Sequence, residues 1–346
     1  MSDETRSGGA NEHRWRRYDA VEKRHATFPL VREPRIDTLD RKLVIAVAPC
    51  GAFVDKQAVP GVPNSPAEII DITAACFEAG ATFAHIHCKT AEGVLTLEAD
   101  ITIDTLQPIK RACPGIIISG NVADRKEFAD RQLFAEPLEE ILKVDPDLFD
   151  TYTLQTHTRT QWKVTREGLQ DQVRYLEDRG IKPELQCPTF IGPKNVQQWL
   201  IEPGVLRMTP YFVNAHIGKD SIPITLGEPF SAEMTLKGIH MLPKGSTKGV
   251  FPCGRNWLPT AIIALTQGID LIRLGFDDAV YMYPHRNEQA ETTLAMVRKI
   301  VRIANELGIE IARVEEARAI LGLAGTATER ARQLAGALPA SDAALA

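Results

Sequence analysis

From Leu43 onward, short apolar runs alternate with longer segments of mixed polarity. The first run, 43–48, has the composition of a strand that is buried on both faces. The stretch 65–68 (Ser-Pro-Ala-Glu) then predicts a helix start, because serine caps a helix, proline fits its first turn and glutamate three residues later completes the cap. We expect this helix to end at Gly80. The ordered part of the chain therefore begins with a strand and a helix.

Seven more strand and helix pairs are predicted after this one. The second strand is the apolar run from Ala81 that carries His85 and His87, and the later strands are expected near 115–120, 147–154, 183–187, 209–215, 248–253 and 269–275. The helices are expected near 101–111, 135–143, 167–179, 193–201, 230–241, 257–267 and 287–307.

Eight such units between Leu43 and Gly308 fit the roughly 250 residues that are typical of a (β/α)₈ barrel. A doubly wound open sheet is the competing architecture. Its glycine-rich phosphate motif is missing, because 49–52 reads Pro-Cys-Gly-Ala. The α/β fold class is therefore predicted to be a TIM barrel.

Three regions follow from this pattern. Residues 1–40 are rich in charged and small residues and are expected to be a flexible arm or an extension packed on a neighbour. Residues 41–325 form the barrel, including one extra helix over 313–323. The alanine-rich tail, 326–346, is expected to be helical or frayed.

Composition narrows the class of protein. The 346 residues are 44% hydrophobic, which is enough for a full core, and the formal net charge of -5 gives no basic surface for nucleic acid. The six cysteines have no Cys-x-x-Cys spacing and mostly lie in apolar runs, as reduced core thiols do. Polar first residues and the lack of a long apolar run predict a cytoplasmic protein with no membrane partner.

Polar residues gather where the predicted strands end, which is where a barrel of this kind builds its active site. In a strand His85 and His87 point the same way, with Phe83 below them and Ile86 opposite. The other strand ends carry Asn121, Thr153, Gln155, Gln186, Asn214, His216, Arg255, Arg273, Asp277 and Asp278.

A metal bound by His85, His87 and one carboxylate, for which we choose Asp277, would have three protein ligands and open positions. The same ligand set suits zinc, iron or manganese. Two plainer interpretations stay open: one histidine is a hydrogen-bonded core residue and the other lies on the surface, and Arg273 makes a structural ion pair with either aspartate.

Several separated motifs resemble one known family. From about Leu43 to Leu323 the chain is similar to the β-keto acid cleavage enzymes, typified by 3-keto-5-aminohexanoate cleavage enzyme. The motifs are Ala75-Cys76-Phe77-Glu78-Ala79-Gly80-Ala81, His85-Ile86-His87, Arg255-Asn256-Trp257-Leu258-Pro259, Arg273-Leu274-Gly275-Phe276-Asp277-Asp278 and Arg302-Ile303-Ala304-Asn305-Glu306-Leu307-Gly308.

The resemblance implies a zinc-binding (β/α)₈ barrel. Members of the family exchange a β-keto acid with acetyl-CoA and release acetoacetate and a new CoA thioester. Carried over by position, His85, His87 and Asp277 would bind the metal. Arg273 would match the arginine of the site and Asp278 its general base.

The substrate-holding residues depart from the family pattern. The family usually has glutamate at the position of Asp277 and arginine at Lys89. Its type member also has glutamate at Phe53 and at Gln186, which would hold a cationic amino group. We therefore expect a substrate other than a 5-amino-3-keto acid.

The carboxylate-binding Ser-Thr-Gly-Gly stretch is replaced by 120–123, which includes Asn121. The candidate substrate-binding residues are Asn121, Gln186, Phe53, Lys89 and Arg255. The expected function is metal-dependent cleavage of a β-keto acid with acetyl-CoA, and the alternative is a metal-dependent C–C lyase or hydrolase that needs no CoA. A non-enzymatic relative is the third hypothesis. Barrels of this type commonly assemble, so a homo-oligomer is expected.

Overall fold

The computed structural model describes residues 14–19, 24–29, 36–52, 54–121, 131–157, 164–218 and 232–336. The chain divides into two compact units, Met1–Asp37 and Thr38–Ala346. In the first, β1 (Arg14–Asp19) and β2 (Arg24–Pro29) form a two-stranded antiparallel sheet in which Arg14 pairs with Pro29. The sequence analysis expected no strands in this polar extension, although its aromatic and threonine residues have strand propensity.

Eight strands of the second unit form a closed barrel of parallel strands, which confirms the predicted (β/α)₈ fold. The last strand pairs with the first, since Leu271 lies opposite Val44. The strands are β3 (Val44–Val47), β4 (Ala81–His85), β5 (Ile117–Gly120), β6 (Thr151–Gln155), β7 (Lys182–Cys187), β8 (Tyr211–Ile217), β9 (Ser246–Pro252) and β10 (Leu271–Leu274).

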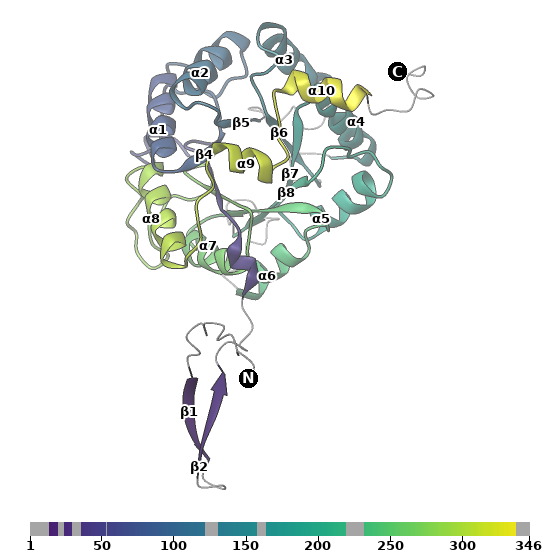
Figure 1. The fold of residues 1–346 in the computed structure, drawn as a ribbon. Coiled ribbons are helices and arrows are strands. Elements are labelled where there is room, and N and C mark those ends of the chain that lie inside the picture. Colours follow the sequence, from purple (N-terminus) through teal and green to yellow (C-terminus); the bar gives the residue numbers. More distant parts are fainter. Residues whose placement is uncertain are drawn as a thin grey trace, which may run out of the picture. The chain divides into compact units, whose positions relative to one another are not determined.

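A helical segment follows each strand, and together these segments surround the barrel (Figure 1). They are α1 (Pro66–Glu78), α2 (Ala99–Ala112), α3 (Arg131–Val144), α4 (Arg166–Glu177), α5 (Ile191–Asn195) with the π-helix η3 (Val196–Ile201), α6 (Ala232–His240), α7 (Trp257–Thr266) and α8 (Thr293–Glu306). A short 3₁₀ helix, η2 (Asp37–Asp40), precedes β3. No helix in the described ranges has the length and apolar character needed to cross a bilayer.

Local capping explains where α1 and α8 begin. In α1 the Ser65 hydroxyl accepts a hydrogen bond from the Glu68 main-chain nitrogen at 3.3 Å, as its sequence predicts. The predicted start of α8 at 287 was wrong by several residues. Thr292 is extended and caps α8 by accepting from the Ala295 nitrogen, while a bridge between Tyr281 and Gln289 holds the preceding segment in a loop.

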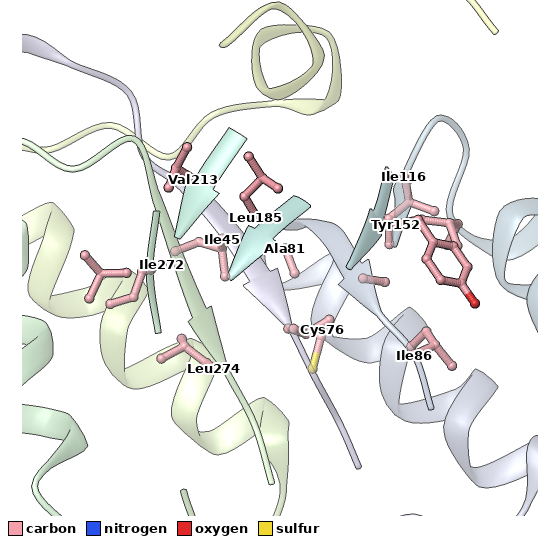
Figure 2. Packing of buried hydrophobic residues seen from close by; sticks show 14 of the residues in the cluster. Ile45, Cys76, Ala81, Ile86, Ile116, Tyr152, Leu185, Val213, Ile272 and Leu274 are labelled. Carbon is pink, nitrogen blue, oxygen red and sulfur yellow. The ribbon is translucent and has the colours of Figure 1, made fainter. Parts of the chain in front are cut away.

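Two apolar layers make the core. The outer layer packs strand residues such as Ile45, Leu185 and Val213 against helix residues such as Cys76 (Figure 2). The inner layer fills one end of the barrel and includes Phe83 on β4. The strand faces therefore alternate between helix contacts and the barrel interior.

One extra helix, α9 (Val314–Ile320), lies across an opening of the barrel (Figure 1). Ala317 on this helix and Leu321 and Leu323 after it pack into the inner apolar layer. Lys42, just before β3, bonds Glu316 at 2.8 Å, so α9 closes the end where the strands begin. The tail then forms α10 (Ala327–Gly336). The opposite end of the barrel, where the strands finish, remains available for a functional site.

Candidate metal centre and acid–base pair

The histidine pair lies where β4 ends. His85 is the last residue of the strand and His87 follows it, and their Nε2 atoms lie 3.3 Å apart. Both residues are buried, with exposed fractions of 2% for His85 and 8% for His87. Phe83 belongs to the inner layer and Ile86 to the outer layer, as strand alternation predicts. The two imidazoles thus face the same buried space.

Asp277 completes a group that could hold a metal ion. Its carboxylate oxygens lie 3.9 Å from His85 Nε2 and 3.8 Å from His87 Nε2, and the three ligand atoms lie within 4.8 Å of one another. Ligands about 2.0–2.1 Å from a tetrahedral zinc ion are about 3.3 Å apart, so small movements would bring all three onto one ion. The donor set of two imidazoles and a carboxylate fits a divalent transition metal.

Two glycines let Asp277 reach this position despite its short side chain. A Cβ on Gly51 would lie 2.0 Å from Asp277 Oδ1 and 2.8 Å from its Cα. Gly275 has a φ of +144°, and a Cβ there would lie 2.0 Å from the Ala48 carbonyl oxygen. The loop after β10 therefore folds directly against the end of β3. Close approach of the main chain thus holds the Asp277 carboxylate 3.8 and 3.9 Å from the two imidazoles.

Arg273 joins Asp277 to the neighbouring aspartate. Its Nε and Nη2 atoms donate to Asp278 at 2.7 and 2.6 Å, and Nη2 also donates to Asp277 Oδ2 at 2.9 Å. Arg273 is only 1% exposed, and its guanidinium lies 3.9 Å from the centre of the Phe251 ring. Burial acts to lower the pKa of Arg273, but Asp278 and Asp277 outweigh it and raise the pKa, so the side chain stays charged. The ion pair of the plainer interpretation is present, with both aspartates.

Two cysteines contact this group, and the sequence analysis treated them only as core thiols. Cys253 Sγ lies 3.6 Å from Asp278 Oδ1, and the Cys50 thiol donates to the His87 carbonyl oxygen at 3.3 Å. Burial raises the pKa of Cys50 to about 12, so it remains a neutral thiol. The alternation of side chains along β9 and the position of Cys50 after β3 were the sequence signals that could have placed the two cysteines in the site.

A layer of polar side chains lies inside the barrel beside His85. Its Nδ1 atom lies 3.5 Å from Ser119 Oγ and 3.4 Å from Thr153 Oγ1. Ser119 in turn donates to Glu184, which also accepts from Asn214 Nδ2 at 3.2 Å. Burial raises the pKa of Glu184, against the lowering effect of nearby Arg273. The sequence analysis missed Glu184, although it shares the inward face of β7 with Gln186.

The predicted substrate-binding residues are held by several different partners. Gln186 donates to Thr153 Oγ1 at 3.4 Å and accepts from Gln155 at 2.8 Å. Asn121 donates to the Ile86 carbonyl oxygen, which ties β5 to the histidine segment. The remaining contacts are Lys89 to the Pro63 carbonyl oxygen at 3.2 Å and Arg255 to the Arg286 carbonyl oxygen at 2.7 Å, with Arg255 also over the Tyr281 ring.

Phe53 lies outside the described residues. The structure thus brings His85, His87, Asp277, Arg273 and Asp278 into one cluster. Gln186 is linked to this cluster through Thr153. Lys89 and Arg255 hydrogen-bond to loop carbonyl groups.

Comparisons with known proteins agree on one family for this chain. The family model described as beta-keto acid cleavage enzyme matches residues 42–323. A 3-keto-5-aminohexanoate cleavage enzyme from Fusobacterium nucleatum is 28% identical over 284 residues, which are 82% of this chain and 98% of that protein. A 3,5-dioxohexanoate:acetyl-CoA acetone transferase from Paraburkholderia graminis is 25% identical over 308 residues, covering 83% of this chain and 97% of that protein.

Among solved structures, the apo form of ObcA has the same fold. It superposes with a TM-score of 0.62 at 17% sequence identity. The match covers 76% of this chain and 66% of ObcA, so the chain spans about two thirds of that protein.

Proposed function

Because the chain belongs to the β-keto acid cleavage enzyme family, we propose that it uses acetyl-CoA to cleave a β-keto acid, with zinc bound by His85, His87 and Asp277. The single observation that carries the proposal is the buried cluster in which this triad shares Asp277 with the Arg273–Asp278 pair. A Lewis acid and a positioned carboxylate side by side at one end of the barrel are what this chemistry requires. Iron or manganese is the alternative metal.

The proposed reaction exchanges two acyl groups. The bond between C2 and C3 of R–CO–CH₂–COO⁻ breaks, and C2 with its carboxylate joins the acetyl carbon to give acetoacetate. The acetyl C–S bond breaks and the R–CO group forms the new CoA thioester. A bound divalent metal would supply polarisation of the keto oxygen, where negative charge develops when a proton leaves C2.

The side chains of this chain supply the remaining parts. Asp278 is the proposed general base that takes a proton from C2 and returns it to C2 when the C2–C3 bond breaks, since two hydrogen bonds from Arg273 fix the orientation of its carboxylate. Arg273 keeps its positive charge throughout and balances the negative charge that accumulates. Phe251 packs on the guanidinium and restricts its movement.

The Gln155–Gln186 pair bears on the substrate side chain. These two buried amides hydrogen-bond to each other at 2.8 Å. Gln186 also hydrogen-bonds to Thr153, which lies beside the cluster. The two amides offer no negative charge to an ammonium group, whose desolvation would go uncompensated. We therefore propose a β-keto acid with an uncharged or anionic side chain.

The test combines metal analysis with a screen of β-keto acids scored for acetoacetate. Acetoacetate that appears only when acetyl-CoA is added, from a protein holding one zinc per chain, is the expected result. Bound metal with C–C cleavage that does not need CoA would instead favour a lyase or hydrolase. A 5-amino-3-keto acid is included as a control substrate, and its efficient turnover would contradict the proposed side chain.

A further inference from the structure

A chain of hydrogen bonds inside the barrel leads from His85 to the buried carboxyl group of Glu184. His85 Nδ1 lies 3.5 Å from Ser119 Oγ, and Ser119 donates its hydroxyl hydrogen to Glu184 Oε2. Asn214 Nδ2 donates to the other oxygen at 3.2 Å. Ser119, Glu184 and Asn214 have no exposed surface, and His85 is 2% exposed. None of Ser119, Glu184 and Asn214 has a part in the reaction proposed above.

The direction of these hydrogen bonds assigns the proton on His85. A serine hydroxyl has one hydrogen, and once Ser119 gives it to Glu184 its oxygen can only accept. Ser119 therefore favours a proton on His85 Nδ1. A neutral imidazole with its proton on Nδ1 has its lone pair on Nε2, which is the atom beside His87 and Asp277.

The hydroxyl group of Thr153 also lies beside His85 Nδ1, so the position of the imidazole proton is not set by Ser119 alone. Thr153 Oγ1 lies 3.4 Å from His85 Nδ1 and already accepts from Gln186 at 3.4 Å. The hydroxyl hydrogen of Thr153 is therefore able to point at Nδ1, which would place the imidazole proton on Nε2 and block metal binding there. Thr153 alone therefore permits either tautomer, because its second lone pair can also accept from Nδ1. An ionised Glu184 decides between the two tautomers, because its carboxylate can only accept and so takes the hydrogen of Ser119.

The barrel wall is shaped to hold Glu184 in place. A Cβ on Gly249 would lie 1.6 Å from Asn214 Oδ1, so only glycine on β9 leaves room for the second donor to Glu184. We propose that Glu184, acting through Ser119, is a positioning residue that holds His85 in the tautomer that binds metal through Nε2. This inference rests on the metal site of the proposed function. Partners behind metal-binding histidines typically change metal affinity by about 10–100-fold.

The test measures zinc affinity of the full chain with Glu184→Gln. The glutamine keeps the size of the side chain but can donate to Ser119, whose hydrogen is then able to turn to His85 Nδ1. We expect the Kd for zinc, measured by competition with a chromogenic chelator, to rise about 10–100-fold. The visible spectrum of the Co²⁺-substituted protein should change as well, since it reports the ligands directly.

Glu177→Gln is the matched control. Glu177 is also fully buried, on α4, and accepts hydrogen bonds from Arg207. Glu177→Gln should lower the denaturation midpoint and leave the zinc Kd unchanged. An unchanged Kd in Glu184→Gln would overturn the inference, and so would an equal rise in both variants, because the effect would then be general destabilisation.

Ser119→Ala gives a second, independent variant that removes one oxygen atom. It should raise the Kd to a similar extent, and the double variant with Glu184→Gln should bind no more weakly than Ser119→Ala alone. Independent, multiplying effects would contradict the proposed chain. If the native protein binds no zinc, both this inference and the proposed function fail. If native activity and zinc binding are present and the variants bind normally, this inference alone fails.

Discussion

Asp277 is the residue on which the two parts of the site depend. It faces both imidazoles and accepts a hydrogen bond from Arg273, while Asp278 next to it accepts hydrogen bonds from Arg273 and contacts Cys253. Adjacent aspartates with different neighbours suit different tasks. Replacing each one separately should therefore produce two distinguishable defects.

Asp278→Asn should retain metal and lose activity. The amide cannot take the C2 proton, so we expect kcat to fall by about 10²–10⁴-fold with zinc content unchanged. Asp277→Asn is the comparison and should lose zinc together with activity. Steady-state kinetics and metal analysis on the same preparations check this, and loss of zinc from Asp278→Asn would contradict the division of roles.

Gly51→Ala should weaken metal binding although Gly51 has no side chain to bind with. The added Cβ would lie 2.0 Å from Asp277 Oδ1, so the aspartate must move away from the histidines. We expect the zinc Kd to rise at least about tenfold. Gly336→Ala, where a Cβ meets no atom within 4 Å, is the matched control and should bind zinc normally.

At the scale of the elements, the order of strands and helices could be predicted from the sequence. The spacing of apolar residues and the capping residues are both local signals. The Ser65 cap, for example, is confirmed. The start of α8 was predicted too early because the extended Thr292 caps the helix, which leaves residues 287–291 outside it. β1 and β2 were not predicted because the pairing of two strands depends on both segments together, and the sequence of either segment alone indicates it only weakly.

The candidate site was predictable in its ligands and less so in their support. His85, His87, Asp277, Arg273 and Asp278 lie on or next to strand ends, where the barrel rule applies. The hydrogen bond from Ser119 to Glu184 joins residues that are far apart in sequence, and the type of neither residue predicts it. Gly51 is similar, since its importance is set by Asp277, which is distant in sequence and follows the neighbouring strand.

The element α9 should contribute to stability without contributing to chemistry. Leu321 directly after it is fully buried in the inner apolar layer at the end where strands begin. Leu321→Ala should lower the free energy of unfolding by about 2–5 kcal/mol. Chemical denaturation measures this, and zinc stoichiometry should stay native. A loss of zinc in the folded variant would show that the two ends of the barrel are coupled.

At the scale of the whole molecule, one buried lysine makes stability depend on pH. Lys182, the first residue of β7, is 1% exposed, and its Nζ has no hydrogen-bond partner among the described residues. Burial lowers the pKa of Lys182 from 10.5 to about 7, which nearby Glu177 only partly opposes. Above pH 7 the folded protein has released a proton that the unfolded chain still holds. Stability from this group therefore rises with pH.

The free energy of unfolding should increase by about 2 kcal/mol between pH 7 and pH 9 through Lys182. Lys182→Met should be more stable than the native chain at pH 7 and should lack this part of the rise. The window ends near pH 9 because buried thiols such as Cys50, whose pKa is raised from 9.0, act in the opposite direction above it. Urea denaturation across the window checks the difference, and parallel curves for the two proteins would contradict it.

Closure of the barrel between β10 and β3 has a consequence for how the protein is made. A ribosome produces His85 and His87 early, whereas Asp277 emerges only after the last barrel strand. The growing chain thus carries a bare pair of imidazoles through most of its synthesis. The three candidate ligands can come together only when the final strand closes the ring, so a metal ion could be held by all three only late in translation.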